Sequence, residues 1–311
     1  MPPKESGIPI FQCDSRLVLL VRSACVLLLV GRAWQHLFWD APFRALLWSQ
    51  ATMEGVVKAV LGLDWEAYAS NPTISDTIQG VIRGFGAFYL LAAVVAMVYP
   101  VDAKACGRRW LAGVLLCASL SLFFLGYLYY RDKVLRLGEW GEYACQFSAP
   151  VLLLLFANGH KTLAGWWLRI AVAITFACHG LYAIGYYPMP GEWVTMTMEC
   201  LGSGDEMAAF LLKHAGYLDM AVAVLVFFRG RLEMLALGYA AIWGFLTALA
   251  RPWCFIEPDS FGESLGYWGW EFLVRTPHFL LPLVALGLAM AAHKATPTKY
   301  MDAPLSSPQP E

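Results

Sequence analysis

Long apolar stretches separated by short polar connections run along almost the whole chain. A bilayer core about 30 Å thick requires roughly 20 mostly apolar residues in a helix. Eight segments fit this requirement, and we predict that each spans the membrane: residues 16–37, 77–99, 108–130, 142–158, 164–186, 206–228, 231–250 and 268–292. The fourth is the weakest, because Pro150 interrupts it. The pattern predicts an all-α, polytopic integral membrane protein.

The charges of the connections alternate in sign and predict the orientation. One set of connections is short and basic, with Lys104, Arg108, Arg109, Lys161, Arg229, Arg231, Lys294 and Lys299. The other set is longer and acidic, and only its 131–140 loop is basic. Basic loops stay on the cytoplasmic side. We therefore expect a multi-pass protein of the cell inner membrane with both termini in the cytoplasm and the acidic loops in the periplasm or outside the cell.

An internal repeat divides the predicted spans into two sets of four. Residues 138–142 (GEWGE) match 266–270 (GYWGW), and residues 83–88 match 213–218. A unit with an even number of spans re-enters the membrane in the same direction, so the two copies are parallel. We predict two parallel four-helix units, 16–160 and 161–293.

The remaining segments of the chain lie outside the spans. Residues 1–15 are expected to form a cytoplasmic N-terminal segment, and 294–311 a disordered cytoplasmic tail. The first outer loop, 38–76, is long enough for an amphipathic helix at about 43–62 on the outer surface.

Composition and charge exclude several classes of protein. Of 311 residues, 59% are hydrophobic and 14% are charged, whereas soluble domains carry about 25% charged residues. We therefore expect the lipid bilayer to surround most of the chain. The formal net charge of −1 excludes nucleic-acid binding through bulk positive charge. No cysteines form a CxxC pair. Cys200 and Cys254 both lie in polar loops, and the sequence does not decide whether they form a disulfide.

Ionisable residues inside the predicted spans are the candidate functional groups, since each costs at least about 2.5–3.5 kcal/mol at a helix centre. Arg32, His36 and Asp40 are spaced i, i+4, i+8, and Glu271, Arg275 and His278 are spaced i, i+4, i+7. Other candidates in the predicted outer half are Trp34, Gln35, Arg83, Arg131, Glu142, Gln146, His179, Lys213 and Arg251. Together they predict a polar cavity open to the outer face.

We predict two kinds of role within this cavity. His36, His179, Glu271 and His278 are the candidate catalytic groups, in which an imidazole moves protons. Arg32 or Arg275 would hold a carboxylate, an oxyanion or a carbonyl oxygen, and the other candidates would complete a ligand-binding site.

Structural roles are the alternative for several of these residues. Glu271 and Arg275 could be an ion pair that only makes insertion tolerable, and Arg32 could extend to the interface. Arg22 and Asp219, the deepest charges, are expected to neutralise each other or to belong to a proton path.

A metal site is not expected. No span carries histidine and carboxylate residues with metal-ligand spacing on one helix, such as HxxxH, HxxE or ExxH. Haem ligation by two histidines on separate helices is the alternative that the sequence leaves open.

The stretch Gly31-Arg32-Ala33-Trp34-Gln35-His36-Leu37 ends a first helix that precedes a long outer loop and three closely linked helices. This unit, present twice, resembles the DoxX-like superfamily of membrane proteins. A weaker resemblance connects the chain to the membrane domain of vitamin K-dependent carboxylase-like (HTTM) proteins. The chain departs from DoxX-like proteins in having about twice the length of one unit and no cysteine-pair motif.

The resemblance implies a quinone-linked redox subunit or a small-molecule-binding membrane enzyme, with quinone as the candidate cofactor. Two other functions stay open. The first is a non-enzymatic assembly factor, cargo receptor or complex subunit whose tryptophan-rich outer loops dock a membrane or periplasmic protein. The second is a small-molecule transporter that depends on the deep charges.

Overall fold

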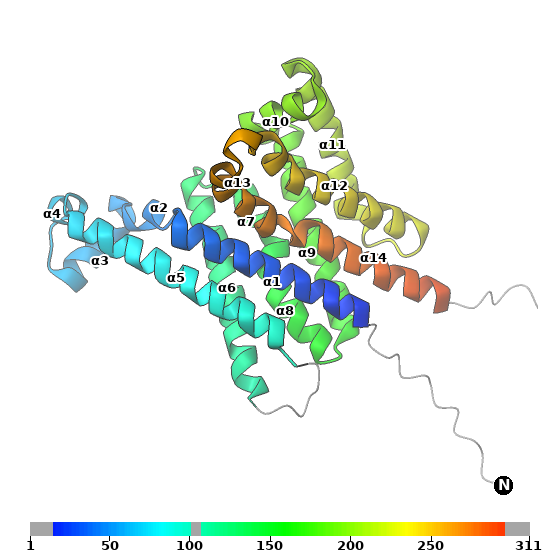
Figure 1. The fold of residues 1–311 in the computed structure, drawn as a ribbon, viewed down its shortest axis with the longest axis horizontal. Coiled ribbons are helices and arrows are strands. Elements are labelled where there is room, and N and C mark those ends of the chain that lie inside the picture. Colours follow the sequence, from blue (N-terminus) through cyan, green and yellow to red (C-terminus); the bar gives the residue numbers. More distant parts are fainter. Residues whose placement is uncertain (1–14, 101–106, 296–311) are drawn as a thin grey trace, which may run out of the picture.

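A computed structural model describes residues 15–100 and 107–295, and within these ranges every regular element is helical (Figure 1). The elements of the first half are α1 (Ser15–Phe38), α2 (Arg44–Leu47), α3 (Gln50–Leu61), α4 (Trp65–Ala69), α5 (Pro72–Val98), α6 (Arg108–Asp132), α7 (Leu137–Gly141) and α8 (Ala144–Ala157). Those of the second half are α9 (Lys161–Ala183), α10 (Gly191–Leu201), α11 (Asp205–Leu225), α12 (Arg231–Phe255), the 3-10 helix η1 (Pro258–Ser260), α13 (Phe261–Arg275) and α14 (Pro277–Ala295).

Seven segments of the described chain are long and apolar enough to cross a membrane. They are α1, α5, α6, α9, α11, α12 and the segment Pro258–Lys294, which holds η1, α13 and α14. Large apolar side chains on these helices, such as Leu120, Leu235 and Ile242, point away from the protein core, which indicates contact with lipid. The chain is thus a helical, multi-pass membrane protein. The predicted span 142–158 is not among the seven, because α8 has only 14 residues.

Four helices form the centre of the molecule, with the others arranged around them. α1 and α9 both contact α8 and α14. α5 lies along α1 and α11 lies along α9, while α6 contacts α8 and α12 contacts α14. The last helix of each half therefore contacts the first helix of the other half.

Glycines permit the same close approach in both halves. A Cβ atom at Gly86 of α5 would lie 3.0 Å from the backbone nitrogen of Leu37, at the end of α1. A Cβ at Gly216 of α11 would lie 3.0 Å from the backbone nitrogen of Ile184, just after α9. The sequence comparison of residues 83–88 with 213–218 aligns the same two glycines.

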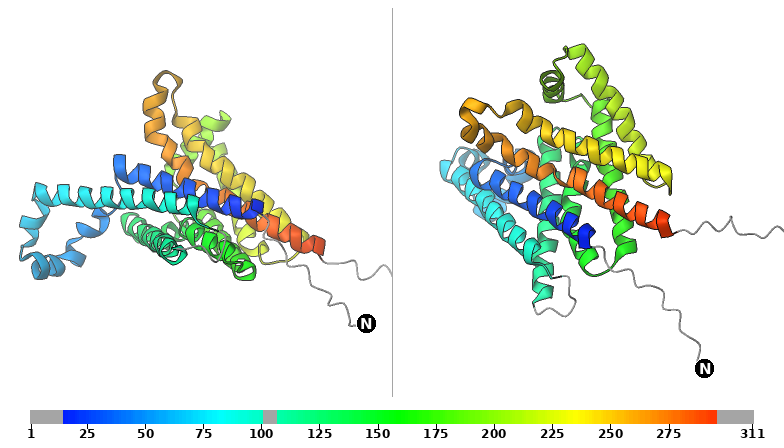
Figure 2. Two further views of the ribbon diagram at one scale, coloured as in Figure 1. Left: turned by 60° about the horizontal axis from the view of Figure 1, so that its bottom comes forward. Right: turned by 45° about the vertical axis from the view of Figure 1, so that its right-hand side comes forward.

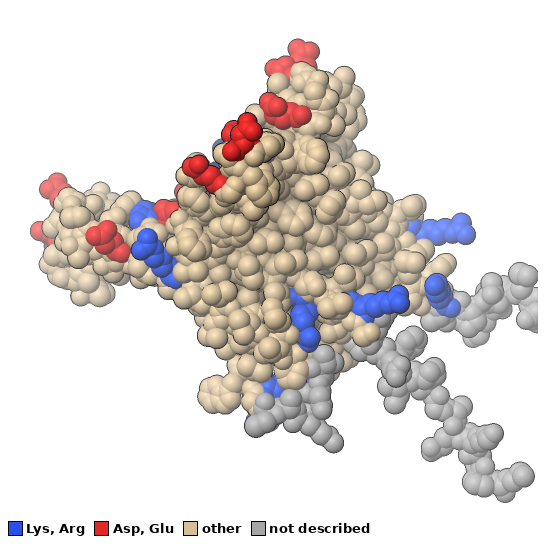
Figure 3. Space-filling view, in the orientation of Figure 1, with Lys and Arg blue, Asp and Glu red and all other residues tan. Residues whose placement is uncertain are grey.

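The two ends of the helical bundle differ in charge. The beginning of α1 and the end of α14 lie at the same end (Figures 1 and 2). On the face shown in Figure 3, lysine and arginine side chains predominate toward that end, whereas aspartate and glutamate gather at the opposite end. Most of the predicted cytoplasmic segments, 1–15 and 294–311, lies outside the described residues.

The long loop after α1 contains α2, α3 and α4, and α3 and α4 extend beyond the rest of the bundle in both figures. Helix is present within the predicted range 43–62, but it is divided at Trp48 and Ser49 into α2 and α3.

The predicted span 268–292 is also divided. α13 ends at Arg275 and α14 begins at Pro277. A proline is well tolerated at the first position of a helix, where its missing N–H is not needed, although Thr276 before it keeps helical dihedral angles (φ −54°, ψ −34°). Pro277 therefore favours a new helix start at this point.

Candidate functional site

A cavity of about 940 Å³ lies between helices of both halves of the chain. Residues of α1 and of α6 through α14 line it. The lining extends from Arg32 and His278, which are buried, to Leu201 and Trp253, which are largely exposed. The cavity therefore connects the interior of the bundle with its surface.

Arg32 of α1 lies at the buried limit of this cavity, with a side chain that is 1% exposed. Its guanidinium donates hydrogen bonds to Oε1 of Gln35 and to Oε1 of Gln146, each at 2.6 Å. The same group lies 5.1 Å from the ring centre of Tyr143 and 5.8 Å from that of Tyr129. It forms no ion pair with any carboxylate in the part of the chain that the structure describes.

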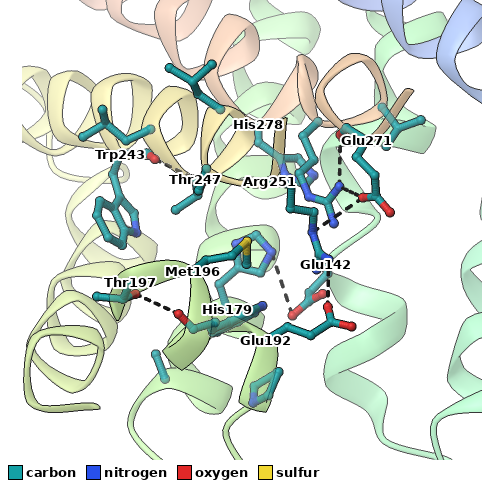
Figure 4. A pocket seen from close by; sticks show the side chains of 18 of the residues that line it. Glu142, His179, Glu192, Met196, Thr197, Trp243, Thr247, Arg251, Glu271 and His278 are labelled. Carbon is teal, nitrogen blue, oxygen red and sulfur yellow. Dashed lines mark hydrogen bonds and ion pairs between the residues drawn. The ribbon is translucent and has the colours of Figure 1, made fainter. Parts of the chain in front are cut away.

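A chain of ion pairs crosses the wall of the cavity (Figure 4). Arg275 pairs with Glu271 one turn earlier in α13. Arg251 of α12 lies between two carboxylates, with Nε 3.6 Å from Glu271 and an Nη1 atom 2.7 Å from Glu192 of α10. These pairs join α10, α12 and α13 and compensate the charges of both arginines.

Two histidines and a glutamate form a second polar group in the cavity, His179, His278 and Glu142, all of which are labelled in Figure 4. The His179 and His278 rings have their centres 5.4 Å apart and are nearly perpendicular, at 73°. Nε2 of His179 lies 3.8 Å from Oε1 of Glu142. Nε2 of His278 is buried and has no hydrogen-bond partner in the structure.

Aromatic side chains form much of the cavity wall. Trp193 lies with its ring centre 6.0 Å from that of His179. The other tryptophans that line the cavity are Trp243, Trp253, Trp268 and Trp270. The cavity thus combines charged and hydrogen-bonding groups with aromatic walls, an arrangement typical of small-molecule sites.

No family model, curated protein or solved structure matches this chain. The resemblance to the DoxX-like superfamily and the weaker one to HTTM proteins therefore stay predictions. The chemistry of the site is interpreted from its own residues.

Eight of the residues that the sequence proposed for the site line the cavity. They come from five separate regions of the chain: Arg32, Glu142, Gln146, His179, Arg251, Glu271, Arg275 and His278. Although a helix break separates Arg275 from His278, both still face the cavity. Three of the four candidate catalytic residues are in this set.

His36 is the candidate catalytic residue that lies elsewhere. Its ring is fully buried on another side of α1, 5.1 Å from the ring of Tyr89 and 6.2 Å from that of Phe43. Its Nδ1 is 2.8 Å from the carbonyl oxygen of Arg32. One turn separates Arg32 from His36, but Arg32 faces α8 while His36 faces α5.

The other six proposed residues are also outside the cavity lining. Gln35 supports Arg32 and donates to the Tyr129 hydroxyl at 2.8 Å. Asp40 lies beyond the end of α1 and pairs with Arg44 at 2.9 Å. Arg131 binds the hydroxyls of Ser49 and Thr52, Arg83 and Lys213 are exposed, and Trp34 packs against α13 near Gly269.

The predicted pairing of the deep charges is wrong. Arg22 donates to the carbonyl oxygen of Tyr99 at 2.6 Å, and Asp219 accepts from the Tyr239 hydroxyl at 3.2 Å. The buried ion pair of the bundle joins Arg169 of α9 to Glu233 of α12 instead, with Nε and Oε1 2.8 Å apart.

Sequence reasoning missed Glu192 and Tyr143 as site residues. Glu192 was only one charge of an acidic loop, and its role depends on α10 folding over the cavity. Tyr143 directly follows Glu142 at the start of the predicted span 142–158, so its position was a usable signal. Among the described residues, no group of three histidine, cysteine, aspartate or glutamate side chains is placed to hold a metal ion.

Proposed function

We propose that this membrane protein binds a small amphiphilic molecule in the cavity, with carbonyl or carboxylate oxygens held at the floor and an apolar body between the tryptophans. The observation that carries the proposal is a pair of buried nitrogen atoms without hydrogen-bond partners, Nε of Arg32 and Nε2 of His278, on residues that line the same cavity. Buried polar atoms are normally paired. Ligand oxygens between these residues would supply the missing partners.

The charge of the floor favours an electron-rich group. Arg251 and Arg275 are compensated by Glu192 and Glu271, whereas Arg32 has only neutral amide partners. An unpaired buried charge is costly. An oxyanion or a polarised carbonyl oxygen beside Arg32 would offset that cost through a charge-assisted hydrogen bond.

The imidazoles suit a ligand whose oxygens exchange protons. His179 and His278 face each other, and Glu142 lies 3.8 Å from His179. This group can transfer protons to or from a bound oxygen through the imidazole nitrogens. A quinone has this combination of apolar body, carbonyl oxygens and proton-coupled chemistry, so quinones are our first ligand class. The electrons would come from a partner redox protein, which makes the chain a quinone-linked subunit.

The membrane arrangement that we propose follows the charge distribution. The basic end of the bundle, where α1 begins and α14 ends, is cytoplasmic, and the cavity opens outward. The chain forms two parallel four-helix units in which α7 and α8 complete the first and α13 and α14 the second. The matching contacts at Gly86 and Gly216 support this repeat.

Binding can be tested with the full chain purified in detergent. Organic extracts are examined by mass spectrometry for a stoichiometric lipid-soluble molecule, and tryptophan fluorescence is titrated with a short-chain ubiquinone analogue. We expect saturable quenching that is lost in Arg32→Met and His278→Ala. Arg22→Met serves as the matched control, because Arg22 is on the same helix but outside the cavity lining.

Two results would overturn the proposal. One is quenching of the same size in all four proteins, which would place the analogue in the detergent micelle. The other is the absence of both a bound molecule and saturable quenching from folded protein. Copurification of another polypeptide together with this second result would favour the assembly-factor alternative.

A further inference from the structure

Helix α10 forms one wall of the cavity, contributing Glu192, Trp193, Met196, Thr197 and Cys200 to the lining. It crosses the entrance between α9 and α11 and contacts both α11 and α12. What holds α10 in place therefore determines the shape of the entrance.

Contacts near both ends of α10 join it to the end of α12. Near its beginning, Glu192 pairs with Arg251 at 2.7 Å. Near its end, the sulfur of Cys200 lies 2.9 Å from the sulfur of Cys254. The Cys254 sulfur also lies 3.5 Å from the carbonyl oxygen of Met196. Cys200 is exposed and Cys254 is partly exposed, so solvent reagents can reach them.

We propose that Cys200 and Cys254 form a disulfide that fastens α10 to α12 at the entrance of the cavity. The two residues are 54 positions apart in sequence, yet the fold brings their sulfurs together between the ends of α10 and α12. A disulfide requires the two residues to be close enough for the sulfurs to meet without backbone movement. Disulfides persist on the outer side of a cell membrane, where thiols are not kept reduced, and this is the side that the charge distribution assigns to α10.

The bond would form by thiol–disulfide exchange with an oxidant that itself carries a disulfide. The thiolate of one cysteine attacks the oxidant, forms a mixed disulfide and releases one thiol. The thiolate of the second cysteine then attacks the sulfur of the first and releases the other thiol of the oxidant. The protein loses two electrons and two protons, and the oxidant is reduced to the dithiol level.

Thiol counting on the full chain tests this proposal. Protein purified without reductant is denatured, its free thiols are blocked with N-ethylmaleimide, and it is then reduced and labelled with polyethylene-glycol maleimide. We expect two added polymer units in wild type and in Cys117→Ser, and none in Cys200→Ser or Cys254→Ser. Mass spectrometry of the unreduced digest should identify one linked pair of peptides containing Cys200 and Cys254. Because the counting is done on denatured wild type, its result does not depend on the folding of a variant.

The effect on α10 is measured by limited proteolysis of the folded protein. Reduction should accelerate cleavage between α9 and α11 by about threefold or more, because the segment loses its covalent constraint. The Cys200→Ser/Cys254→Ser double variant should be cleaved at the reduced rate with or without reductant. Wild type without added polymer units, even after incubation with oxidised glutathione, would overturn the proposal. Ligand binding in the cavity does not enter either measurement, so failure here is distinct from failure of the proposed function.

Discussion

Arg32 and Gln146 are hydrogen-bonded at 2.6 Å across 114 positions of sequence, and this contact joins α1 to α8 at the floor of the cavity. The guanidinium is 1% exposed and its partners are neutral amides. A positive charge in such a place is a cost to folding unless something else compensates it. The position of Arg32 is therefore better explained by a ligand than by stability.

Replacing Arg32 with methionine separates these two explanations. A charge-assisted hydrogen bond contributes about 1.5–3 kcal/mol, which corresponds to a loss of roughly 10- to 100-fold in affinity. We expect Arg32→Met to bind the ubiquinone analogue more weakly by this factor. Its melting temperature should stay within a few degrees of wild type. The measurements are fluorescence titration and thermal unfolding in detergent. If the variant binds normally but unfolds at a much lower temperature, Arg32 is structural.

The sequence predicted the helical membrane fold because long apolar segments are a local signal. Eight of the candidate residues line one cavity. The sequence could mark them as candidates because burying charge is costly wherever along the chain it occurs. The predicted fourth span has no counterpart among the seven long apolar segments of the described chain, since α8 is only 14 residues long and contains Pro150. Length and hydropathy alone do not decide whether such a short helix crosses the membrane.

Helical spacing could not show which way each side chain faces. Arg32 and His36 are one turn apart, but α1 is enclosed on several sides, so the two residues face different neighbours. The partners of Arg22 and Asp219 depend on how the helices cross, which no local pattern in one sequence records. The same applies to the fold of α10, which brings Glu192 to Arg251.

Gly244 of α12 lies where α14 passes most closely. A Cβ atom there would be 2.9 Å from the carbonyl carbon of His278 and would overlap its oxygen. Overpacking of this kind costs typically about 1–3 kcal/mol. We expect Gly244→Ala to lower the free energy of unfolding by this amount and to weaken binding in the cavity, since it displaces His278.

Gly238→Ala is the matched control for this substitution. Gly238 is on the same helix, and a Cβ there would meet nothing within 4 Å. Alanine is favoured over glycine inside a helix by up to about 1 kcal/mol, so this variant should be as stable as wild type or more stable. Equal destabilisation by both variants, measured by thermal unfolding, would contradict the close approach of α12 and α14.

The pair of Arg169 and Glu233 should contribute to folding rather than to the cavity. Glu233 is 3% exposed, and removing one partner of a buried pair typically costs about 3–5 kcal/mol. We expect Glu233→Gln to destabilise the protein by an amount of this order. Glu192→Gln, at the largely exposed partner of Arg251, should cost at most about 1 kcal/mol. The Arg169→Met/Glu233→Met double variant should recover much of the stability lost in Glu233→Gln. If the double variant is no more stable than Glu233→Gln, the unpaired Arg169 charge does not cause the destabilisation.

Glu139, in the short helix α7 between two membrane segments, predicts a dependence of stability on pH. Burial raises the pKa of its carboxyl above the usual value of 4.5, more than nearby Tyr182, Lys133 and Arg136 lower it. The folded protein then holds the proton more tightly than the unfolded chain does. The resulting stability is fully present below the unfolded pKa and is lost as the pH rises through the folded pKa.

Thermal unfolding of wild type and Glu139→Gln across this pH range tests whether this contribution to stability falls as the pH rises. The glutamine keeps the shape of the protonated carboxyl without its titration. The stability of wild type relative to Glu139→Gln should therefore fall from about pH 4.5 upward and become constant once the carboxyl is fully ionised. Glu139→Asp, which retains a carboxyl, should show a dependence of the same sign. A difference that instead grows in favour of wild type with rising pH would mean that Lys133 and Arg136 stabilise the charged form more than burial disfavours it.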